Sequence, residues 1–225
     1  MNVFLQKDNP FGGEHFIGVA MTGSEQQRHT GLYYRINLDA KVQFLHLGFH
    51  FDLRLEAPKD KHCWLAIAGL DEVEQQMLAI WFEKIWAHNG KNIPYGIHYS
   101  RSPHFNLEGG FIATDSAGGL TCATFILALF EDYGFSIIDT NSARSRADDK
   151  DWHDLIINAL KIDAKASSEY IENQRVFLGR AARFRPEEVA GATSTYLGRA
   201  LSFDDAMSVG VEVLQQMRKL GGLAP

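Results

Sequence analysis

Apolar and polar residues alternate over residues 42–56, VQFLHLGFHFDLRLE. From Leu45 to Leu55 every odd position is apolar, while most of the even positions hold histidines or charged residues. A period of two is typical of a strand that buries one face and leaves the other face polar. The pattern therefore predicts one strand over 42–56.

Three further segments have strand-like composition. HTGLYYRI at 29–36 is rich in aromatic and β-branched residues, and the segment 37–41 separates it from the next strand as a hairpin loop does. The short apolar run CWLAIAG at 63–69 predicts a buried strand, and FSIIDT at 135–140 predicts another. Residues 1–28 have little periodicity and several turn residues, so they predict an irregular lead-in.

Helical spacing begins after these strands. Over 71–88 apolar residues recur every three or four positions, Asp71 and Glu74 match a capping box, and Gly90 offers a C-terminal stop. Residues 91–121 contain two prolines and several glycines, so they predict a long loop of functional interest. A second helix is expected to begin at the end of this loop.

The tail of the chain is helical in character. The charged stretch SARSRADDKD at 142–151 predicts a boundary between a first unit, 1–145, and a helical extension, 146–225, packed on it. Within the extension a last helix is expected near 203–218, with Ser202 as its cap. Strands flanked by helices, followed by a helical tail, make α+β the expected fold class.

Composition narrows the class of protein. The chain has 225 residues, of which 45% are hydrophobic and 22% charged, and its formal net charge is -6. That charge argues against nucleic acid as a partner, because phosphate-backbone binding needs a basic surface. The N-terminus lacks the apolar stretch of a signal peptide, and no window is apolar enough for a membrane span. We therefore expect a cytoplasmic protein, and its oligomeric state stays open.

Cys122 is the most reactive candidate. It follows Gly118 and Gly119, and Thr121 is placed to cap a helix that begins at the cysteine. Free N–H groups and the helix dipole at such a start favour thiolate, so the sequence predicts a lowered thiol pKa. The alternative is that Cys122, like Cys63, is a small buried apolar residue, which is the commoner role of a lone cysteine. Neither cysteine lies in a zinc-binding pattern.

A thiol nucleophile needs a histidine that exchanges protons and a third group that orients it. His29 and His46 are roughly symmetric about the predicted hairpin loop, so the two strands can bring them face to face. A metal site built from His46, His50 and Asp52 is a weaker alternative, because alternation alone produces such polar stripes. His98, His104 and Asp115, in the loop ahead of the cysteine, remain ambiguous.

HTGLYYRINLDAKVQFLHL and GLTCATFI together resemble the motifs of the circularly permuted NlpC-like papain-fold cysteine hydrolases. This group includes the relatives of lecithin:retinol acyltransferase. The resemblance covers about residues 29–135, and the order of the motifs, with histidine strands before the cysteine helix, is that of the permuted members. It departs from the family pattern in a longer hairpin loop and in Thr121, where the family has Asp or Asn.

The resemblance implies a permuted papain-like sheet packed on a nucleophile helix. It implies Cys122 as nucleophile, His29 as general base and acid, and His46 as the residue that orients His29. Tyr95 in IPYG would line the pocket or help to bind the oxyanion. Gly119 and Thr121 would lie beside the substrate, and no metal or other cofactor is implied.

The expected activity is thiol-dependent cleavage of an amide or peptide bond, or acyl transfer. A hydrolase of lipid or other acyl esters is the nearest alternative, so the partner is a small-molecule, peptide or acylated substrate. A different class of protein is a non-catalytic binding or regulatory protein on the same fold. Four arginines of the tail motivate that alternative, because they would supply a partner surface: Arg175, Arg180, Arg183 and Arg185.

Overall fold

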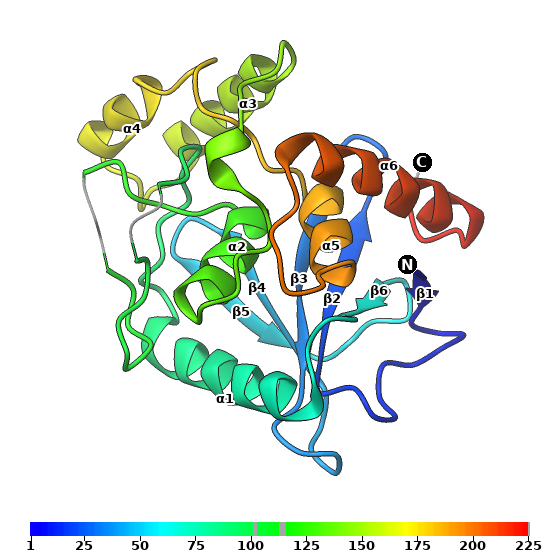
Figure 1. The fold of residues 1–225 in the computed structure, drawn as a ribbon. Coiled ribbons are helices and arrows are strands. Elements are labelled where there is room, and N and C mark those ends of the chain that lie inside the picture. The colour runs from blue at the N-terminus through cyan, green and yellow to red at the C-terminus, as the bar shows by residue number, and fades with distance from the viewer. Residues whose placement is uncertain (101–102, 113–115, 225) are drawn as a thin grey trace.

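The computed structural model describes residues 1–100, 103–112 and 116–224. Its centre is a six-stranded antiparallel sheet with strand order β1-β6-β2-β3-β4-β5 (Figure 1). The coarse prediction of an α+β fold is confirmed. The strands are β1 (Phe4–Leu5), β2 (Ile17–Gly23), β3 (Arg28–Tyr34), β4 (Gln43–Phe49), β5 (Asp52–Glu56) and β6 (Cys63–Ala66).

Helices cover one face of this sheet, with α2 and α5 in front of the strands in Figure 1. The main core lies between the two layers, where Leu32 and Leu45 of the sheet join Phe125 and Val189 of the helices. The helices are α1 (Glu72–Asn89), α2 (Cys122–Asp132), the short 3-10 helix η1 (Thr140–Ser142), α3 (Asp149–Ile162), α4 (Ser168–Arg175), α5 (Pro186–Ser194) and α6 (Phe203–Lys219).

The opposite face of the sheet has a smaller aromatic cluster. Phe11, Tyr33, Phe44 and Trp64 are buried there, and Tyr33 and Phe44 pack edge to face. Side chains alternate between the two faces of a strand, so Tyr33 belongs to this cluster while Leu32 belongs to the main core. The sheet is thus apolar on both faces.

Three strand predictions are wrong. Residues 1–28 are not irregular throughout, because they contain β1 and β2. The five consecutive buried residues that begin β2 give a central strand with no alternation to detect. The segment 42–56 is two strands, and the turn at His50 and Phe51, where Phe51 has φ of 54°, separates them. The segment 135–140 forms only an isolated bridge, Ile138 to Leu201, before η1.

The helix predictions that rest on caps are confirmed. Asp71 and Glu74 form both halves of a capping box, and α1 begins at the residue after Asp71. Ser202 caps α6 through the Asp205 N–H. The hairpin between β3 and β4 also forms as predicted.

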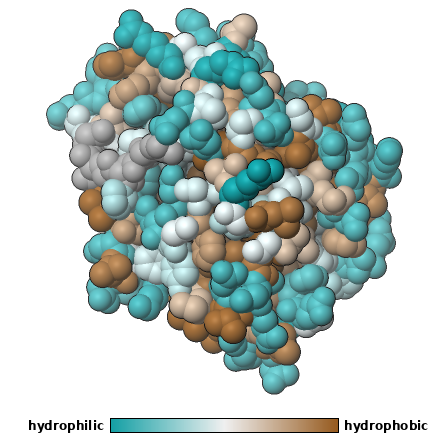
Figure 2. All heavy atoms as spheres, in the orientation of Figure 1, coloured by the Kyte–Doolittle hydropathy of each residue, from teal (hydrophilic) through white to brown (hydrophobic). Residues whose placement is uncertain are grey.

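The tail, from residue 146 on, packs against the rest of the chain. Val189, Phe203 and Val213 lie in the same apolar core as the sheet. The stretch 142–151, predicted to be a boundary, contains the fully buried Asp149 and the start of α3. Figure 2 shows the helix-bearing face, where hydrophobic residues lie in small groups among hydrophilic ones. Within the described ranges, no helix has the length and apolar character needed to cross a bilayer.

Candidate active site

Cys122 is the first residue of α2, as predicted. Thr121 is the N-cap: its hydroxyl accepts the Thr124 N–H at 3.1 Å, and the Thr124 hydroxyl accepts the Thr121 N–H at 2.7 Å. This reciprocal pair satisfies two N–H groups that a helix start leaves without partners. The position of the thiol is therefore fixed by its immediate neighbours in the sequence.

The prediction of a lowered thiol pKa at Cys122 is wrong for this structure. The residue is only 6% exposed, and burial raises the pKa of its thiol. The backbone N–H groups of Thr30 and Ala123, the Tyr95 hydroxyl and the positive charge of Arg183 act in the opposite direction, but burial is the larger effect. The resting group is a neutral thiol surrounded by donors that would stabilise a thiolate.

His29 and His46 form a direct pair. His29 Nε2 lies 2.8 Å from His46 Nδ1, and the two rings are nearly perpendicular. Burial, reinforced by nearby positive charge, lowers the pKa of His29 to about 3. Burial also lowers the pKa of His46 to about 4, although Glu56 acts in the opposite direction. Both imidazoles are therefore neutral at pH 7, and one proton lies between them.

Gly31 makes room for this pair. The register Leu32 to Leu45 places Gly31 across from His46. A Cβ atom at Gly31 would lie 2.6 Å from both the His46 Cβ and the Leu45 carbonyl oxygen. Only glycine leaves space here for His46, which reaches diagonally across the strands to His29.

The thiol and the imidazoles lie at one end of the β3–β4 pair. The described β3–β4 pairing runs from Leu32 to Tyr34 on β3, whereas the earlier residues of that strand pair with β2. Thr30, whose N–H faces the thiol, is the chain neighbour of His29. No hydrogen bond joins His29 directly to Cys122 within the described part of the chain. The imidazoles lie on the face of Phe44, while α2 packs on the other face.

Glu56 is a partner of His46 that the sequence analysis missed. His46 Nε2 is buried without a hydrogen bond within the described residues, and Glu56 Oε1 is 3.8 Å from it. The other oxygen of Glu56 pairs with Lys59, an exposed residue. The alternating pattern of 42–56 includes Glu56 among its polar positions. Glu56 comes close to His46 only because a turn folds β5 back beside β4, and a single strand over 42–56 has no such turn.

Tyr95, predicted to line the pocket, lies beside Cys122, and burial raises the pKa of its hydroxyl well above the ordinary value. Gly119, predicted to lie beside the substrate, is packed instead against protein. A Cβ there would lie 2.5 Å from the Tyr170 hydroxyl and 2.8 Å from the Gly96 nitrogen. The role of Gly119 is therefore close packing of the loop ahead of the cysteine.

Helix α4 holds the two loop segments that flank the thiol. The Tyr170 hydroxyl donates to the Tyr95 carbonyl at 3.0 Å. Gln174, fully buried, accepts the Ile97 N–H at 2.8 Å and donates to the Ala117 carbonyl at 2.6 Å. These contacts leave no local signal in the sequence, because they join residues more than 50 positions apart.

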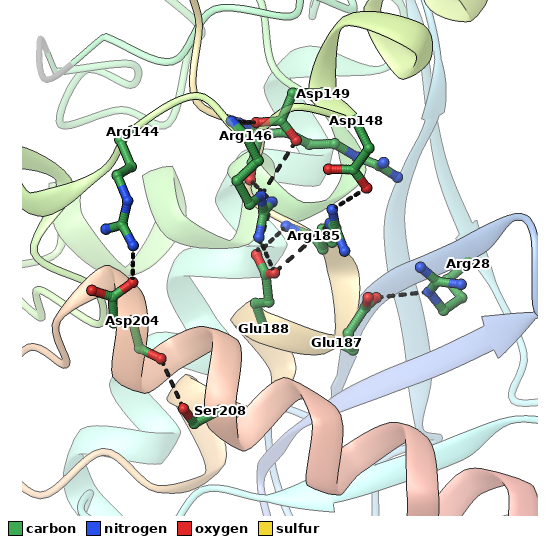
Figure 3. A network of polar contacts seen from close by, with 11 residues as sticks. Arg28, Arg144, Arg146, Asp148, Asp149, Arg185, Glu187, Glu188, Asp204 and Ser208 are labelled. Carbon is green, nitrogen blue, oxygen red and sulfur yellow. Dashed lines mark hydrogen bonds and ion pairs between the residues drawn. The ribbon is translucent and has the colours of Figure 1, made fainter.

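A network of ion pairs ties α5 to β3 (Figure 3). Arg28, next to His29, donates to Glu187 at 2.9 Å, and Glu187 is only 3% exposed. On the same helix Glu188 pairs with Arg146, which also contacts the buried Asp149. The tail helices thus fix the strand that bears the predicted general base.

The predicted metal alternative does not assemble. His46 pairs with His29, while His50 Nδ1 accepts the Tyr95 N–H at 3.1 Å. Among the residues that the structure describes, no group of three or more His, Cys, Asp or Glu side chains is arranged to hold a metal ion. His104 is 3% exposed within its loop. Asp115 lies outside the described residues.

Two cavities lie elsewhere. One of about 510 Å³ is lined mainly by apolar residues of the N-terminal segment and the end of α5. A smaller one of about 190 Å³ lies between His98, Thr140 and Arg180. Comparison with protein-family models, curated proteins and solved structures found no match.

Proposed function

We propose that this chain is a cysteine hydrolase, or an acyltransferase, that cleaves an amide or peptide bond through Cys122, His29 and His46 on a permuted papain-like fold. The main support is the His29–His46 contact of 2.8 Å, made at the end of the sheet where the thiol meets Thr30. Ester substrates follow the same chemistry. We place the activity in the cytoplasm, because Cys63 and Cys122 are both free thiols, which is usual in a reducing compartment.

Glu56 selects the tautomers that suit a general base. A carboxylate near His46 Nε2 favours a proton on that nitrogen, which leaves His46 Nδ1 as an acceptor. His29 must then donate from Nε2, so that its Nδ1 holds a free lone pair. Nδ1 is the atom that accepts the thiol proton when His29 approaches Cys122.

The reaction then proceeds in two halves. As Cys122 Sγ forms a bond to the carbonyl carbon, its proton passes to His29, which returns that proton to the departing amine or alcohol. Water attacks the resulting thioester after giving a proton to His29, and the acid leaves as the thiol is restored. The Cys122 and Ala123 N–H groups and the Tyr95 hydroxyl are the candidate oxyanion donors.

The relative pKa values of Cys122 and His29 in the free protein determine when the proton is transferred. Because burial raises the pKa of Cys122 and lowers that of His29, the free site holds thiol and imidazole rather than an ion pair. Proton transfer therefore accompanies attack. His29 lies on the Phe44 face of the sheet and α2 packs on the other face, so the mechanism requires the His29 side chain to move to the thiol when substrate binds.

The test is turnover of p-nitrophenyl acetate and of an amide such as an acyl p-nitroanilide by the full chain. We expect acyl-enzyme on Cys122, detected by mass spectrometry, and loss of turnover by at least about 100-fold in Cys122→Ala and His29→Asn. His46→Asn should lose less, because His46 only orients His29. Cys63→Ala is the matched control, since Cys63 is fully buried and burial raises its thiol pKa to about 11.

Two results would overturn the proposal. One is turnover that survives in Cys122→Ala. The other is absence of turnover together with absence of acyl-enzyme for esters and amides alike, which would favour the non-catalytic alternative.

A further inference from the structure

Arg183 differs from the other half-buried arginines near the site. Arg146 and Arg185 both pair with carboxylates, whereas Arg183 makes no ion pair with any residue that the structure describes. Its guanidinium lies over the ring of Trp152, with the central carbon 4.4 Å from the ring centroid. Its Nε is buried and has no hydrogen-bond partner among the described residues.

The acids around Arg183 are used by other groups. Asp149 accepts hydrogen bonds from the Arg146 side chain and from the Arg183 backbone N–H. Glu187 pairs with Arg28. Arg183 is thus a half-buried cation that lies over an aromatic ring and has no carboxylate partner within the described ranges. This arrangement resembles a binding site for an anion more than a structural ion pair.

The charge of Arg183 reaches the candidate active site. It is close enough to Cys122 and Tyr95 to act on both groups electrostatically. Arg183 lies just ahead of α5, and the Glu187–Arg28 ion pair joins that helix to β3. The Thr30 N–H of the same strand faces the thiol, so an anion at Arg183 would lie near a substrate whose carbonyl is at the thiol.

We propose that Arg183 binds an anionic group of the substrate, a carboxylate or a phosphate, and so selects anionic acyl compounds. That the bound anion belongs to a substrate rests on the proposed function, but anion binding at Arg183 does not require turnover. A planar guanidinium whose Nε has no partner among the described residues suits bidentate contact with either group. The Trp152 ring lies against the guanidinium and holds it in position.

Alkylation of Cys122 tests the site without any catalysis. Iodoacetate is anionic and iodoacetamide is its neutral counterpart, so the ratio of their rates at Cys122 reports the local preference for an anion. We expect Arg183→Gln to lower this ratio by about tenfold, the effect of one lost charge-assisted contact. Arg183→Lys should keep part of it. Arg175→Gln removes an exposed arginine of the same tail and should leave the ratio unchanged.

Protection of the unmodified protein is the second measurement. Succinate and inorganic phosphate at millimolar concentration should slow alkylation by iodoacetamide, and the more effective of the two identifies carboxylate or phosphate as the preferred group. An unchanged rate ratio in a folded Arg183→Gln variant would overturn the proposal. Absence of protection by both anions would also overturn it, and that result does not depend on the folding of any variant.

A substrate comparison separates this inference from the proposed function. If the chain hydrolyses esters, Arg183→Gln should reduce kcat/KM for mono-p-nitrophenyl succinate much more than for p-nitrophenyl acetate, mainly through KM. Equal losses for both esters would contradict anion recognition while leaving the hydrolase proposal intact. Absence of all turnover, with the alkylation ratio still dependent on Arg183, would contradict the hydrolase and keep the anion site.

Discussion

At the scale of single residues, the geometry of the imidazole pair depends on a glycine. His46 packs where the side chain of residue 31 would lie, and this lets it reach His29 on the neighbouring strand. Gly31 therefore has a steric role at a site whose chemistry belongs to other residues.

The Gly31→Ala variant should separate the two imidazoles. Its Cβ would lie 2.6 Å from the His46 Cβ and the Leu45 carbonyl oxygen, so the strands must move apart. We expect a loss of about 2 kcal/mol in the free energy of unfolding and a large loss of turnover. Urea unfolding and ester hydrolysis measure these effects. Gly12→Ala is the control, because a Cβ at Gly12 meets nothing within 4 Å.

Glu56 is expected to act through the tautomer of His46. In Glu56→Ala, His46 loses the acceptor near Nε2, so a larger share of His29 should hold its proton on Nδ1, where it cannot serve as a base. We expect about a tenfold fall in kcat, with nitrogen-15 NMR of the His46 ring as the direct readout. Glu56→Gln should restore part of the rate.

Lys59→Ala is the matched control for Glu56. It removes the exposed partner of the same carboxylate and should leave the His46 tautomer unchanged. If Glu56→Ala and Lys59→Ala have equal effects on the NMR signal, Glu56 has no specific role at His46.

At the scale of elements, some parts of the candidate site are determined by neighbouring residues in the sequence, and others by contacts between distant segments. The start of α2 was predictable because Thr121, Cys122 and Thr124 are close in sequence. The β3–β4 hairpin and its histidines were predictable for the same reason. The α4 contacts and β2 were not predictable: α4 acts across more than 50 residues, and β2 is buried on both faces.

Gln174 should be the most sensitive residue of α4. Gln174→Leu would leave the Ile97 N–H and the Ala117 carbonyl buried without partners. We expect a loss of about 2 to 4 kcal/mol in the free energy of unfolding. Faster hydrogen exchange at Ile97 and in the loop before Cys122 should accompany it.

Asn173→Ala provides the comparison on the same helix. Asn173 donates to the Ser116 carbonyl at 3.2 Å on the exposed side of α4. Its loss should change the free energy of unfolding by less than about 0.5 kcal/mol. Similar destabilisation by both variants would show that helix α4 itself matters, rather than its buried amide.

At the scale of the whole molecule, buried histidines should make the protein sensitive to acid. Burial lowers the pKa values of His46, His62 and His104 to about 4, and that of His29 to about 3. A histidine with a lowered folded pKa stabilises the fold above its unfolded pKa of about 6.5, and this contribution is lost as pH falls toward the folded pKa. The upper limit is about 3 kcal/mol for each of the three histidines with a pKa of about 4, and about 5 kcal/mol for His29.

Asp132 acts in the opposite direction. Burial raises its pKa to about 6, so the stability that it adds to the fold at low pH is lost as pH rises toward 6. Burial likewise raises the pKa of Glu188 and lowers the pKa values of His50 and His153. Two acids thus oppose six histidines, so the free energy of unfolding should fall from pH 7 to pH 4. Denaturant unfolding at a series of pH values measures it. A constant value between pH 7 and pH 5 would contradict the assigned burial of the imidazoles.

The α4 contacts also have a consequence for synthesis of the chain. Tyr170 and Gln174 reach back 52 and 57 residues to Gly118 and Ala117. A ribosome must therefore release the tail before the loop ahead of Cys122 acquires its hydrogen bonds. The cysteine leaves the exit tunnel well before its surroundings are complete, and the thiol of a nascent chain lacks these contacts until translation reaches α4 and α5.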